Sequence, residues 1–127
     1  MNKICTSKEQ SKKLIELGID VNTANMFWLD GVPGIYPPRL VSCYKRGMTN
    51  GTPAWSLSAL LNLKPETIVP DNSSHQVYQM DVYNYDGLRI CEYVGEIDRD
   101  SLVGFEKKWF IDAAFEMVCW LKENKKI

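Results

Sequence analysis

The stretch Phe110–Leu121 reads F-I-D-A-A-F-E-M-V-C-W-L and decides the predicted fold. Its apolar side chains recur at helical spacing and fall on one side of a 3.6-residue wheel: Phe110, Ile111, Ala114, Phe115, Met117, Val118 and Leu121. Asp112 and Glu116 fall on the other side. Because burial of each large apolar side chain contributes roughly 1.5–3 kcal/mol, this pattern predicts a long C-terminal helix packed on the rest of the fold.

Trp120 lies opposite the apolar stripe on this wheel. Two interpretations stay open: the indole covers a second layer of the protein, or it is exposed and marks a contact site. Lys122, Lys125 and Lys126 at the end of the helix suit the helix dipole.

The segment Ser101–Trp109 precedes this helix. If it were helical, Lys107 and Lys108 would point toward the buried side, so we expect a strand near Leu102–Trp109 and a helix that begins at Phe110.

A β-hairpin is predicted from Gln76–Tyr83 and Leu88–Val94, where apolar and polar side chains alternate. Asp86-Gly87 supplies the turn between them, because this pair favours the positive φ angles of a two-residue hairpin loop. The preceding segment, Glu66–His75, is predicted to be a loop.

At the N-terminus, Thr6 and Glu9 stand in the arrangement of a capping box, which predicts a helix over Ser7–Leu17. Gly18 is well placed as its left-handed stop, with Ile19 folding back.

Between this helix and the hairpin, Met26–Leu29 and Arg39–Lys45 are predicted strands, an antiparallel pair joined by a Pro/Gly-rich loop. Thr52 and Pro53 resemble the start of a short helix that ends near Leu63.

The order α-β-β-α-β-β-(β)-α predicts an α+β fold, with an antiparallel sheet of about four to five strands and three helices. The long C-terminal helix is expected to pack on this sheet. A length of 127 residues predicts a single domain over residues 1–127.

Composition excludes several classes of function. Hydrophobic residues make up 45% and charged residues 24% of the chain, as in ordinary globular proteins. The net charge of −1 provides no general attraction to nucleic acid or to an anionic membrane. No apolar run approaches the ~20 residues of a membrane span, and the polar N-terminus lacks a signal peptide's apolar core, so we expect a cytoplasmic protein.

The four cysteines are far apart in the sequence: Cys5, Cys43, Cys91 and Cys119. No pair has the short spacing of a zinc site or a redox motif, which favours reduced, at least partly buried thiols. A disulfide pair among them stays open.

Catalytic groups are sparse. His75 is the single histidine and lies in a polar loop, where an exposed structural role is favoured over catalysis. Glu96, Asp98 and Asp100 favour a solvated acidic turn over a cation site, because calcium-loop spacing is absent. The sequence predicts no catalytic residue, metal ligand or cofactor.

A candidate interaction surface combines basic and aromatic residues around the first strand pair with the last tryptophan: Tyr36, Arg39, Tyr44, Arg46 and Trp120. The Arg39–Arg46 region could hold single-stranded nucleic acid by charge and stacking, or present a protein-binding surface. A third interpretation keeps the tryptophans in the core and the arginines in solvent.

Three blocks carry a resemblance that covers most of the chain: K-E-Q-S-K-K-L-I-E-L-G-I-D-V-N-T-A-N-M-F-W, P-A-W-S-L-S-A-L-L-N-L-K-P and F-I-D-A-A-F-E-M-V-C-W-L-K-E-N. They resemble a group of small uncharacterised proteins common in Bacteroides-like gut bacteria, often linked to prophages and other mobile elements. This resemblance implies a bacterial, intracellular accessory protein, and it carries no activity or functional residue.

The leading hypothesis is therefore a non-enzymatic accessory or protein-interaction protein of a bacterial mobile element or prophage. A nucleic-acid-binding module that uses the Arg39–Arg46 hairpin is the alternative, and an enzyme of unrecognised type is a third. We expect an unknown protein as the partner, with nucleic acid disfavoured but still open, and no association with a membrane. The chain is expected to be a monomer or a homodimer formed through a strand edge or Trp120.

Overall fold

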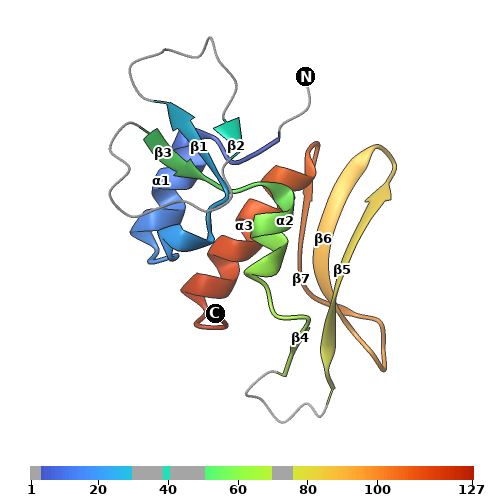
Figure 1. Cartoon of the computed structure of the whole chain (residues 1–127). Coiled ribbons are helices and arrows are strands. Elements are labelled where there is room, and N and C mark those ends of the chain that lie inside the picture. The colour runs from blue at the N-terminus through green and yellow to red at the C-terminus, as the bar shows by residue number, and fades with distance from the viewer. Residues whose placement is uncertain (1–3, 30–38, 41–50, 70–75) are drawn as a thin grey trace. The chain divides into compact units, whose positions relative to one another are not determined.

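A computed structural model describes residues 4–29, 39–40, 51–69 and 76–127 of the chain. The protein has an α+β fold in which two antiparallel sheets accompany three α-helices in this described part (Figure 1). The predicted fold class is thus confirmed, although the strands form two sheets. The chain divides into two compact units, Met1–Leu63 and Lys64–Ile127. Whether residues 1–127 form one domain stays a prediction, which unfolding experiments can test.

The first unit contains a three-stranded sheet in the order β2-β1-β3, with antiparallel neighbours. Its elements are α1 (Lys8–Glu16), the 3-10 turn η1 (Val21–Thr23), β1 (Met26–Leu29), β2 (Arg39–Leu40), β3 (Gly51–Ala54) and α2 (Leu57–Asn62). The predicted strand Met26–Leu29 and its antiparallel pairing with the segment that starts at Arg39 are confirmed. Positions 41–45 of that predicted strand lie outside the described residues.

The N-terminal helix is confirmed, but its predicted cap was wrong by one residue. Ser7 is the N-cap: its Oγ accepts from the Gln10 amide at 3.1 Å, while Gln10 Oε1 accepts from the Ser7 amide at 2.9 Å. The Thr6 hydroxyl accepts instead from the backbone amide of Trp55 at 3.0 Å, so a long-range contact takes Thr6 out of the cap. The predicted stop at Gly18 is confirmed by its φ of 92°.

The second helix begins later than the sequence suggests. Thr52 and Pro53 belong to β3, where they pair with Trp28 and Phe27. Among the strands that the structure describes, β3 lies at one edge of its sheet, a position that tolerates proline because an edge strand pairs on one side. Ser56 caps α2, since its Oγ accepts from the Ala59 amide at 3.2 Å. The helix ends at Asn62 with Leu63 as its C-cap, which confirms the predicted end near Leu63.

The second unit contains a four-stranded antiparallel sheet in the order β4-β5-β6-β7. Its elements are β4 (Thr67–Ile68), β5 (Tyr78–Tyr85), β6 (Leu88–Gly95), β7 (Ser101–Lys107) and α3 (Phe110–Glu123). The predicted hairpin is confirmed, and Asp86 and Gly87 adopt φ angles of 51° and 79° in its turn. β7 and the start of α3 at Phe110 also match the prediction.

Like β3, the strand β4 was not predicted from the sequence. β4 lies inside the segment predicted to be a loop and pairs with the start of β5 through Thr67–Gln79 and Ile68–Tyr78. His75 lies outside the described residues, so its predicted exposed role stays a prediction.

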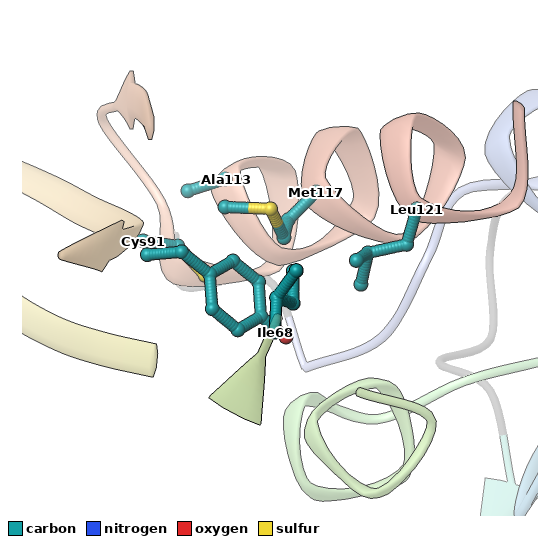
Figure 2. Close-up of a cluster of buried hydrophobic side chains, with 6 residues drawn as sticks. Ile68, Cys91, Ala113, Met117 and Leu121 are labelled. Atoms are coloured by element: carbon teal, nitrogen blue, oxygen red, sulfur yellow. The ribbon is translucent and has the colours of Figure 1, made fainter. Parts of the chain in front are cut away.

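α3 contacts β6 and β7, and one side of the helix packs with side chains of the sheet in a single apolar cluster (Figure 2). The buried members are Ile68, Cys91, Tyr93, Ala113, Met117 and Leu121. The side of α3 in this cluster differs from the predicted stripe, because it includes Ala113 and the partly buried Trp120. These positions follow the helical spacing 113, 117, 120, 121. Ile111, Phe115 and Val118 of the predicted stripe are buried as well.

Candidate protein-interaction face

The strands of the four-stranded sheet also have a side that does not belong to the α3 cluster. Tyr78, Met80, Val82, Cys91 and Phe105 point into that cluster, so the alternate positions lie on the opposite side of the sheet. We call this side the outer face. Its members are Gln79, Asp81, Tyr83, Tyr85, Leu88, Ile90, Glu92, Val94, Gly104 and Glu106.

Carboxylates gather at the centre of the outer face. Asp81 on β5 is directly opposite Glu92 on β6, and Glu106 on β7 is opposite Ile90, which in turn pairs with Tyr83. None of the outer-face positions carries Lys or Arg. Like charges directly opposite each other on a sheet are destabilising, so the carboxylates of Asp81 and Glu92 repel each other, and a cationic partner would reduce this repulsion.

Tyr83 lies among these carboxylates. Its hydroxyl donates a hydrogen bond to Glu92 Oε1 at 2.6 Å. This bond to Glu92, with smaller contributions from burial and from the charges of Glu92, Asp81 and Glu106, raises the pKa of Tyr83 to about 12. The phenol therefore stays neutral over the physiological pH range and reports the negative potential of the outer face.

A Glu92→Gln variant tests this electrostatic arrangement. We expect the pKa of Tyr83 to fall from about 12 toward its ordinary value of 10.0, because the charged acceptor is lost while an amide oxygen remains. The measurement is a difference titration of tyrosine absorbance against a Tyr83→Phe reference, which isolates one phenol. An unchanged titration in Glu92→Gln would contradict the proposed hydrogen bond.

A glycine makes room for the Glu92 side chain. Gly104 on β7 is the register partner of Glu92, and a Cβ added at Gly104 would lie 3.1 Å from Glu92 Cβ. That separation is tighter than ordinary van der Waals contact, so the missing side chain lets Glu92 lie over β7 toward the centre of the face.

Exposed apolar surface lies beside the carboxylates. Tyr85 and Leu88 are a register pair next to the hairpin turn, and their side chains are 70% and 38% exposed. Tyrosine is among the residues that dominate protein-binding surfaces, and both Tyr83 and Tyr85 lie on this face.

The sequence-predicted interaction surface is mostly outside the described residues. Tyr36, Tyr44 and Arg46 lie there, and only the backbone of Arg39 is described, in β2 beside Phe27. Trp120 belongs to the other unit and packs against the α3 cluster. The five residues stay a prediction as a surface.

Sequence reasoning missed the outer face. The alternation of Gln79, Asp81 and Tyr83 with core residues was the available signal, but it concerns one strand. Only the register shows which residues of β6 and β7 stand opposite Asp81 and Tyr83.

The segment around Glu96, Asp98 and Asp100, which was predicted to be an acidic turn, does form a turn. Hydrogen bonds of the Gln76 side chain stabilise it. Gln76 Oε1 accepts from the amides of Ile97 and Asp98, both at 3.0 Å, and Gln76 Nε2 donates to Asp98 Oδ2 at 3.0 Å. Hydrogen bonds from the Asp100 amide and from Gln76 lower the pKa of Asp98. Among the described residues, no group of His, Cys, Asp or Glu is arranged to hold a metal ion.

An open hollow of about 260 Å³ lies at the pairing of β4 with β5, lined by Glu66, Thr67, Gln79 and Met80.

Three of the cysteines, Cys5, Cys91 and Cys119, are buried thiols outside any disulfide, as predicted, whereas Cys43 lies outside the described residues.

No protein-family model, no curated protein and no solved structure matches this chain. In the described ranges, no helix is long and apolar enough to cross a membrane.

Proposed function

We propose that this chain is a non-enzymatic protein-interaction protein whose outer face binds a Lys- or Arg-rich segment of a partner protein. The observation that supports the proposal is the charge of that face: the carboxylates of Asp81, Glu92 and Glu106 lie around Tyr83, and none of the described outer-face positions carries a basic residue. Complementary charge gives such a contact its specificity and its rate of association.

The aromatic residues favour a peptide over a simple cation. A guanidinium or ammonium group binds the negative face of an aromatic ring as well as a carboxylate, and Tyr85 is exposed beside the acidic centre. Tyr83 and Tyr85 would therefore contact the stems and charged ends of basic side chains while the carboxylates neutralise them.

The same charge argues against nucleic acid at this face, because phosphates and carboxylates repel each other. The nucleic-acid alternative depends on the Arg39–Arg46 region, which lies largely outside the described residues. We keep the resemblance to mobile-element and prophage proteins as the biological setting of the proposal: a cytoplasmic accessory protein that acts through a partner.

The test is a binding titration by fluorescence anisotropy with a labelled Lys/Arg-rich peptide, using a triple variant, Asp81→Asn with Glu92→Gln and Glu106→Gln. We expect its affinity to fall at least tenfold, since roughly 1.4 kcal/mol corresponds to a factor of ten. The wild-type affinity should also fall as salt is raised, because exposed charges are screened.

A matched variant removes the same number of charges elsewhere: Glu9→Gln, Glu16→Gln and Glu123→Gln, all of which are exposed in helices. It should bind like the wild type. Equal losses in the two variants would indicate attraction by overall charge alone and would refute the outer-face site. Binding of single-stranded DNA in place of the peptide would favour the nucleic-acid alternative.

A further inference from the structure

A lysine and a cysteine meet inside the second unit, away from the outer face. Lys64 is 6% exposed and Cys91, on the side of β6 that points into the α3 cluster, is 1% exposed. Lys64 Nζ donates a hydrogen bond to Cys91 Sγ across 2.7 Å. A lysine is almost never fully buried without a partner, so this contact determines where the amine lies.

Among the described residues, the other neighbours of Cys91 are apolar side chains and a tyrosine that is hydrogen-bonded elsewhere. The Cys91 thiol lies in the apolar cluster with Ile68 and Met117 (Figure 2). The Tyr93 hydroxyl donates a hydrogen bond to the Pro65 carbonyl at 2.7 Å. That bond ties Tyr93 to the residue that follows Lys64. Burial, and to a smaller extent the charge of Cys91, raises the pKa of Tyr93.

Burial also changes the amine. Loss of solvent lowers the pKa of Lys64, while the charge and hydrogen bond of Cys91 act in the opposite direction. A lowered pKa increases the fraction of neutral amine, which is the nucleophilic form. The same amine can accept the thiol proton, and the thiolate is the form of cysteine that reacts with peroxides.

We propose that Lys64 and Cys91 are an oxidative modification site at which hydrogen peroxide joins Nζ and Sγ through one bridging oxygen atom. The separation of 2.7 Å is shorter than an ordinary N–H···S contact and is close to the span of a single bridging atom, so the bridge forms with little movement of the backbone.

The chemistry balances with two molecules of peroxide. The first oxidises the Cys91 thiol to a sulfenic acid and is reduced to water. The second transfers one oxygen to the Lys64 amine, giving a hydroxylamine and another water. The hydroxylamine oxygen then attacks the sulfenic sulfur, an O–S bond forms, the S–OH bond breaks, and a third water leaves. A thiol reductant cleaves the O–S bond with two electrons, which returns the Cys91 thiol and leaves the hydroxylamine on Lys64, while the reductant is oxidised to its disulfide.

The experiment exposes the purified full chain to hydrogen peroxide, blocks remaining thiols under denaturing conditions and measures intact mass and peptide maps. We expect a product about 14 Da heavier, from one oxygen gained and two hydrogens lost, in which the Lys64 and Cys91 peptides are joined. Dithiothreitol should separate the two peptides and return the Cys91 thiol, with one oxygen, about 16 Da, left on Lys64. The bridge also closes a 27-residue separation in the sequence, so the oxidised chain should melt at a higher temperature than the reduced chain.

Cys91→Ser and Lys64→Met should each abolish the product. Lys64→Arg should abolish it too, and because this variant keeps the positive charge it serves as the test if Lys64→Met does not fold. Cys5→Ser is the matched control, because Cys5 is also a buried thiol and its variant should retain the product. The proposal is overturned by no mass change in the wild type, by a cysteine sulfenic acid without a link, by a link about 2 Da lighter that lacks oxygen, or by a joined product that persists in Lys64→Arg.

Discussion

Replacement of Trp55 by alanine is expected to lower the free energy of unfolding by roughly 3–5 kcal/mol. The Trp55 side chain is 0% exposed, so its removal leaves a large cavity in the first unit. Its Nε1 also donates to Thr23 Oγ1 at 2.9 Å, a hydrogen bond that the variant loses. Urea unfolding followed by circular dichroism measures the change through the shift in midpoint.

Trp55→Phe separates the two contributions. Phenylalanine keeps most of the buried ring but lacks the donor to Thr23, so its cost should be clearly smaller than that of Trp55→Ala. Similar midpoints for Trp55→Ala and the wild type would contradict the expected contribution of the buried Trp55 side chain to stability.

Leu121→Ala is expected to cost about 2–5 kcal/mol in the second unit. Leu121 is 0% exposed and lies on the same side of α3 as Met117 (Figure 2). Both belong to the cluster that includes Tyr93 of β6, so truncation of Leu121 opens a cavity there. Leu88→Ala makes the same chemical change on the outer face, where the side chain is 38% exposed, and should cost under about 1 kcal/mol. Equal costs in the two variants would contradict the assigned side of α3.

These two core variants lie in different units, so together they also test the predicted single domain. If residues 1–127 unfold as one domain, each variant shifts one common transition. If Trp55→Ala shifts one transition and leaves a second in place, the units unfold separately.

Features that depend on local chemistry were predictable from the sequence. Gly18 ends α1 because a left-handed residue is needed there, and Asp86-Gly87 forms the hairpin turn because both residues tolerate positive φ. The start of α3 at Phe110 followed from the helical pattern, since any earlier start would have directed lysines inward. In each case the deciding interactions lie within a few residues of the feature itself.

Features that depend on distant partners were not predictable in this way. Thr6 has the chemistry of a helix cap, yet it bonds to Trp55 because the N-terminal segment pairs beside Ser56. Thr52-Pro53 has the pattern of a helix start, yet it is an edge strand because β1 offers it a ladder. Local propensity is weak compared with a long-range hydrogen-bonded contact, so the contact prevails.

The outer face and the Lys64–Cys91 pair belong to the second kind. Asp81, Glu92 and Glu106 become neighbours only through strand register, and Lys64 reaches Cys91 across 27 positions of sequence. The amino-acid order alone thus determined the α+β class, the hairpin and the C-terminal helix, because periodicity and turn chemistry act over short distances. Tertiary structure decided which side of that helix meets the sheet, how the strands divide into two sheets and where charges gather, because those outcomes depend on pairings between segments far apart in the chain.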